Sequence, residues 1–134
     1  MKKFVIENEF WELFPTAKIG IIVANDIDNT IKDEAKYAPM LAAAEKETDK
    51  FFTEGDFSKN PVIKVWREAF TKFKTKKGAR SSIEALLKRV YNENHIGTIN
   101  PLVDIYNSIS LKYGMPCGGE DIETFAGDVR LTKA

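Results

Sequence analysis

The amino-acid sequence predicts an α+β fold in a single domain over residues 1–134. Three observations lead to this class. A chain of 134 residues has the length of one domain. Its composition is 43% hydrophobic and 30% charged, which provides enough apolar side chains for a buried core. Segments with apolar residues at helical spacing alternate with short apolar runs that are typical of strands, so helices and strands are both expected.

The first 24 residues predict two strands separated by a short helix. Residues 2–6 form the first strand candidate. Residues 7–14 carry Phe10, Trp11 and Phe14 at helical spacing, and Pro15 ends this helix. Residues 17–24 are almost continuously apolar, a pattern typical of a strand that is buried on both faces. A turn follows at residues 25–29.

Two prolines mark the next helices. One helix ends at Phe52 and begins at Lys32 or at Pro39, since proline is favourable in a first turn and disruptive later. The next begins at Asn60-Pro61, where Asn60 is expected to cap the helix. Its predicted buried stripe continues to Phe73.

The remaining helices have recognisable starts and ends. Ser81 with Glu84 forms the spacing of a capping box, and Asn100 before a proline repeats the cap-and-proline start. The second of these helices ends at Tyr113, before Gly114. A late strand is predicted at residues 129–132. The chain stops at once after this strand, so we expect a fragment of a longer protein or a strand completed by a second copy.

Charge is unevenly distributed although the net charge is zero. Residues 61–89 carry nine Lys and Arg against two Asp and Glu, and both flanks are acidic. A basic middle segment is a candidate polyanion-binding surface, and the alternative is an ordinary solvated surface. The candidate phosphate contacts are Lys74, Lys76, Lys77, Arg80, Lys88 and Arg89.

Several function classes lack support in the sequence. Cys117 is the only cysteine, so an intrachain disulfide and a Cys-based zinc site are excluded, and His95 is the only histidine. No phosphate-binding, dinucleotide-binding or zinc-protease motif occurs. We therefore expect no metal and no cofactor. The sequence has no membrane-spanning run and no secretory signal, which favours a cytoplasmic protein without membrane contact.

The helix at residues 101–113 has an unusual polar face. Short polar side chains that are poor helix formers gather on it, and no Lys or Glu solvates it. This composition indicates hydrogen bonds to a nearby loop or to a ligand. The residues concerned are Asn100, Asp104, Asn107 and Ser108.

The turn that follows joins two glycines to two carboxylates. The backbone N–H groups of Gly118 and Gly119 are free to approach a ligand. Glu120 or Asp121 is a candidate for orienting a water molecule. The alternatives are a helix face that braces the turn and an ordinary turn with exposed acids.

Residues 82–121 resemble the tRNA-binding and editing domain (B-three/B-four) of the bacterial phenylalanyl-tRNA synthetase β subunit. The family's helix W-L-x-x-R-L is resembled by Leu86, Leu87, Arg89 and Val90, and its I-N pair by Ile99 and Asn100. The motif V-D-x-x-N and the spaced L, G, P and D after it fall on Val103, Asp104, Asn107, Leu111, Gly114, Pro116 and Asp121. Gly97 and Gly118 replace an arginine and a histidine of the family.

The resemblance implies a β-sandwich-like core with packed helices. It also implies a freestanding editing-like domain that binds tRNA and hydrolyses a mischarged aminoacyl ester with a positioned water. Asn107, Glu120 and Asp121 are then the catalytic candidates, and the substrate-binding candidates are Asn100, Asp104, Ser108, Gly118 and Gly119. Two alternatives remain: a non-catalytic RNA-binding module, favoured by Gly97 and Gly118, and a binder of a free amino acid, favoured by zero net charge. DNA is not expected as a partner.

Overall fold

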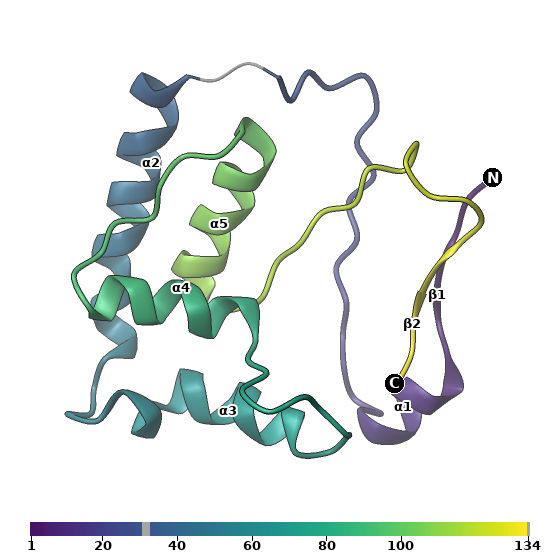
Figure 1. Cartoon of the computed structure of the whole chain (residues 1–134), viewed down its shortest axis with the longest axis horizontal. Coiled ribbons are helices and arrows are strands. Elements are labelled where there is room, and N and C mark those ends of the chain that lie inside the picture. Colours follow the sequence, from purple (N-terminus) through teal and green to yellow (C-terminus); the bar gives the residue numbers. More distant parts are fainter. Residues whose placement is uncertain (31–32, 134) are drawn as a thin grey trace.

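The computed structural model describes residues 1–30 and 33–133. Helices α2 to α5 lie together, and the strand pair with α1 lies beside them on the other side of Figure 1. The structure is therefore mixed, with many helical residues and few strand residues. In chain order the elements are β1 (Phe4–Ile6), α1 (Asn8–Leu13), α2 (Glu34–Glu47), η1 (Thr48–Phe51), η2 (Phe57–Lys59), α3 (Pro61–Phe70), α4 (Ser82–Tyr91), α5 (Pro101–Tyr113) and β2 (Val129–Leu131).

The sheet of the described residues has two strands, which are parallel. Phe4 of β1 is in register with Val129 of β2, and Ile6 with Leu131. The ladder extends beyond the strands, because the Glu7 N–H donates to the Leu131 carbonyl at 2.9 Å. Both predicted terminal strands are confirmed with shorter bounds. The β-sandwich-like core expected from the resemblance is not found within residues 1–30 and 33–133, where the hydrophobic core is helical.

The strand predicted at residues 17–24 is wrong. The structure assigns no strand there, and Ile22 is 93% exposed. A strand needs a neighbouring strand to pair its backbone N–H and C=O groups. Within the described ranges no strand lies against this segment. Most of its apolar side chains therefore remain exposed to water.

Side-chain caps fix the starts of two helices as predicted. The Ser81 hydroxyl accepts from the Glu84 N–H at 3.3 Å, and the Asn100 side chain accepts from the Val103 N–H at 2.9 Å. At the start of α3, Asn60 precedes the helix but does not cap it. Its side-chain oxygen accepts from the Glu54 N–H at 2.9 Å instead, which ties the preceding loop to the helix.

Helix α2 begins earlier than Pro39. Asp33 caps it, and Pro39 lies inside the helix, so the proline-first start is wrong. An interior proline removes one helical hydrogen bond and places its ring against the carbonyl four residues earlier, so the Asp33 cap outweighs it only together with the packing of α2 on α5. The alternative start at Lys32 falls outside the described residues. At its other end the helix continues as η1, close to the predicted end at Phe52.

The hydrophobic core lies between α2, α3, α4 and α5. The exposed fraction of each of its leucine and isoleucine side chains is below a tenth, and half-buried aromatic residues surround them. None of the described helices has the length and apolar content required to cross a bilayer. The core residues are Leu41, Ala44, Ile63, Ile83, Leu87, Ile96 and Leu111.

Candidate functional site

Helix α5 buries its polar face. Asp104 is 2% exposed and Leu111 is fully buried, whereas Ile105 and Ile109 on the other face are each 44% exposed. The buried face packs against α2. Asp104 and Ser108 therefore point into the helical core, whereas Asn100 and Asn107 are half-buried. An apolar face of the same helix is exposed to solvent.

Most of these polar side chains satisfy local backbone groups. The Asp104 carboxylate accepts from the Ile99 N–H at 2.8 Å, and the Ser108 hydroxyl donates to the Ile105 carbonyl at 2.6 Å. Such bonds remove the penalty of burying a polar group. Asp104 thus provides the predicted hydrogen bond to a nearby loop. Asn107 is half-buried, and its side chain has no hydrogen-bond partner among the described residues.

Asn100 and Asp104 line a small cavity between the starts of α2 and α5. The cavity measures about 10 Å³ and is closed on the α2 side by Asp33 and Glu34. This volume accommodates one water molecule. It is too small for an aminoacyl group.

The glycine-rich turn lies along the apolar face of α5. A Cβ placed on Gly119 would be 3.4 Å from a ring carbon of Tyr106, and one placed on Gly118 would meet no atom within 4 Å. Glu120 and Asp121 are exposed, and the Asp121 carboxylate accepts from the Glu123 N–H at 3.0 Å. No hydrogen bond within the described ranges joins this turn to Asn107. The turn and the polar face are adjacent in the chain but lie on different sides of the helix.

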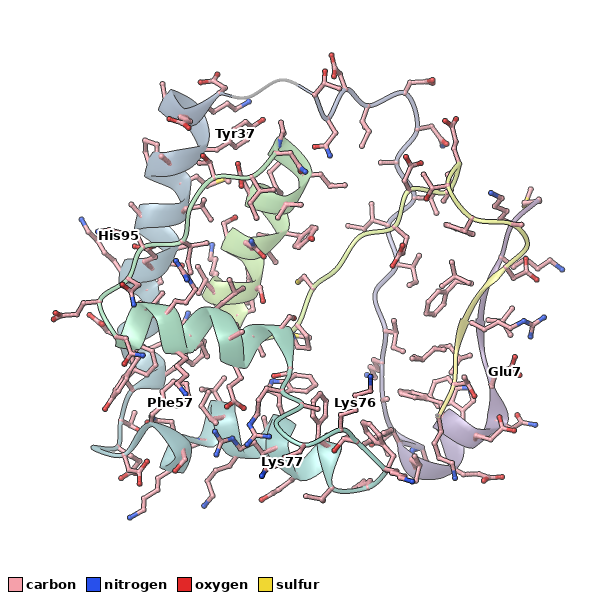
Figure 2. All side chains as sticks on the ribbon, in the orientation of Figure 1. Glu7, Tyr37, Phe57, Lys76, Lys77 and His95 are labelled. Atoms are coloured by element: carbon pink, nitrogen blue, oxygen red, sulfur yellow. The ribbon has the colours of Figure 1, made fainter. Side chains whose placement is uncertain are left out.

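Among the described residues, no hydrogen bond joins Cys117 to His95. Burial raises the pKa of the Cys117 thiol, which lowers the fraction of reactive thiolate at neutral pH. The His95 ring is 90% exposed and lies beside α2, where its Nδ1 is 2.9 Å from the Glu45 carboxylate (Figure 2). In residues 1–30 and 33–133 no cluster of three or more His, Cys, Asp or Glu side chains is arranged to hold a metal ion.

The predicted basic residues are all exposed, and they lie on α4 and on the connector between α3 and α4. Lys76 and Lys77 lie on this connector (Figure 2). Among the described residues, none of its four lysines forms an ion pair, so their charges are available to a partner. We call this set the basic surface: Lys74, Lys76, Lys77, Arg80, Lys88 and Arg89, all of which are exposed.

A buried carboxylate holds two arginines next to the basic surface. The Glu84 side chain is 4% exposed, and its Oε1 is 2.6 Å from Arg67 Nη2 and 3.4 Å from Arg80 Nε. Arg67 donates to both carboxylate oxygens of Glu84, and this bidentate contact raises the pKa of Arg67. The sequence predicted only the capping spacing of Glu84. It missed the Arg67 contact because the two residues lie on separate helices, and the i,i+4 spacing of Arg80 and Glu84 was the one available signal.

An open groove of about 400 Å³ lies over this cluster. Two of its walls are aromatic: Phe70 and Phe73 are half-buried, and their ring centroids are 5.6 Å apart. The sequence predicted Phe73 as the last residue of a buried apolar stripe on the helix that begins at Pro61. Its ring packs instead on Phe14 and Phe70, outside the core cluster. The lining residues are Trp66, Arg67, Phe70, Thr71, Phe73, Thr75, Ala79, Arg80, Ser81 and Glu84.

Comparison with known proteins identifies the family. A model of the B3/4 domain matches residues 65–134, slightly more than half of the chain. This match includes the connector, α4, α5 and β2, and it confirms the resemblance drawn from residues 82–121. No curated protein and no solved structure matches the chain. With its sequence motifs and its matched region in agreement, the chain belongs to the B3/4 domain family.

Proposed function

We propose that the chain is an RNA-binding module that binds tRNA through the basic surface. The observation that carries this proposal is the set of four exposed, unpaired lysines in the described part of the matched region. Phosphate groups attract such mobile cations, and the binding releases condensed counterions. Family membership supports tRNA as the nucleic acid, since the domain is related to a tRNA-binding region of phenylalanyl-tRNA synthetase.

Ester hydrolysis is the finer function that the resemblance implies. It requires Asn107, the backbone at Gly118 and a carboxylate of the turn to surround one acyl carbon. The turn lies on the apolar side of α5, and open space adjoins Gly118. The described geometry thus favours RNA binding over hydrolysis, in agreement with the glycines at positions 97 and 118.

Neutralising the connector lysines is expected to weaken tRNA binding. The variant Lys74→Gln/Lys76→Gln/Lys77→Gln removes three charges and leaves the Arg67–Glu84–Arg80 cluster intact. If each lysine contacts one phosphate, the slope of log K against log salt falls by about three, since each contact contributes about one unit. Filter binding of bulk tRNA at several salt concentrations measures this slope.

The control variant removes the same charge from α2 and its end. Lys36→Gln/Lys46→Gln/Lys50→Gln also changes three exposed lysines, and it is expected to keep the wild-type slope. Equal slopes for the connector variant and the wild-type protein would exclude the three connector lysines as phosphate contacts and contradict the proposal. A wild-type protein that binds no tRNA at all would refute the proposed function.

Hydrolysis is tested separately from binding. Incubation with a panel of mischarged aminoacyl-tRNAs is expected to leave the ester bonds intact at enzyme concentrations that saturate tRNA. Release of the amino acid from any member of the panel would restore the editing role. In that case Asn107→Ala should abolish the release, because Asn107 is the candidate donor to the oxyanion.

A further inference from the structure

The groove between α3 and the connector combines aromatic walls with arginine charge. Its volume of about 400 Å³ falls within the range of ligand pockets. Trp66 packs on the core, and its indole N–H donates to the Gly114 carbonyl at 3.2 Å. Phe70 and Phe73, by contrast, belong to no core cluster. These two rings therefore provide apolar surface at the protein exterior.

The charge at the base of the groove is positive and pre-arranged. Two guanidinium groups meet one carboxylate, so one positive charge remains. Glu84 is buried and fixes both arginines, whose side chains remain 35% and 46% exposed. The Thr75 hydroxyl adds a hydrogen-bonding group to the lining, whereas the Thr71 hydroxyl donates to the Glu68 carbonyl and the Ser81 hydroxyl accepts from the Glu84 N–H. A ligand that combines a planar ring with a separate, singly negative group matches this combination.

We propose that this groove binds one unpaired nucleotide of a single-stranded RNA segment. Because the two rings are inclined at 61°, the base stacks on Phe73 and meets Phe70 at its edge. The phosphodiester lies at Arg80, and the neighbouring phosphates lie on the connector lysines. Stacking on aromatic side chains is how proteins bind single-stranded nucleic acids whose backbone follows a basic surface. The inference rests on the proposed function, because it adds a base-binding site to the phosphate-binding surface.

Two fluorescein-labelled ten-nucleotide RNAs separate base binding from phosphate binding. One is oligouridine, and the other has the same backbone with abasic riboses. In fluorescence anisotropy, the oligouridine is expected to bind at least fivefold more tightly than the abasic RNA, since the stacking of one base contributes about fivefold or more to affinity. Phe73→Leu should abolish this preference and leave the affinity for the abasic RNA unchanged. Phe57→Leu, in η2 before the start of α3, should keep the preference.

A second variant tests the groove in case Phe73→Leu does not fold. Ala79 lines the groove, so Ala79→Leu should fill it and also abolish the preference. Equal wild-type affinities for the two RNAs would overturn the groove proposal and leave the basic surface as the contact. A preference that survives in both variants would overturn it as well. If the wild-type protein binds neither RNA, this inference fails, and the filter binding of tRNA decides whether the proposed function fails with it.

Discussion

Gly114→Ala is expected to lower the free energy of unfolding by about 2–5 kcal/mol. Gly114 ends α5 in the left-handed conformation, with φ of 66°, which costs an L-residue about 1–2 kcal/mol. A Cβ there would lie 2.9 Å from Val62 Cγ2 and 3.0 Å from Phe51 Cζ. Relieving this overlap in a packed site costs about 1–3 kcal/mol more. Urea denaturation followed by circular dichroism measures the change.

Gly78→Ala is the matched control for backbone strain. Gly78 has φ of 80°, but a Cβ there would meet no atom within 4 Å. Its expected loss is therefore the conformational part alone, about 1–2 kcal/mol. Similar losses for the two variants would contradict the packing of α5 against η1 and α3.

Leu111→Ala is expected to lower the free energy of unfolding by about 2–5 kcal/mol. The Leu111 side chain is fully buried in the core on the inward face of α5, and truncation leaves a cavity there. Thermal denaturation and urea denaturation both measure the change. The expected loss is large because the neighbouring helices do not collapse fully onto the missing atoms.

Ile109→Ala tests the orientation of α5. Ile109 lies two residues away on the same helix but is 44% exposed, so its loss should stay below about 1 kcal/mol. A larger loss for Ile109→Ala than for Leu111→Ala would mean that the apolar face is the buried one. That outcome would contradict the described packing of α5 on α2.

The sequence predicted the helices well where a short local signal defines them. Ser81 and Asn100 cap their helices, and Gly114 takes the left-handed conformation, as their residue types and positions indicate. The cap at Asp33 was the signal missed for α2. These features involve residues within a few positions of one another, so their energies depend little on the rest of the fold.

The candidate sites depended on contacts that the sequence does not encode locally. The exposed lysines were predictable from charge alone, whereas the Arg67–Glu84 pair and the groove arise from the packing of α3 beside α4. The polar residues of α5 were recognised as unusual. Nothing in their spacing indicated that Asp104 faces the core and that Gly118 lies elsewhere.

The sequence by itself determined the starts of α4 and α5, the end of α5, the concentration of basic charge and the family. Only the tertiary structure decided which face of α5 is buried and whether residues 17–24 form a strand. Helix caps and charge density are properties of neighbouring residues. Burial and strand pairing are settled by distant segments, which must supply the opposing surface or the hydrogen-bonding edge.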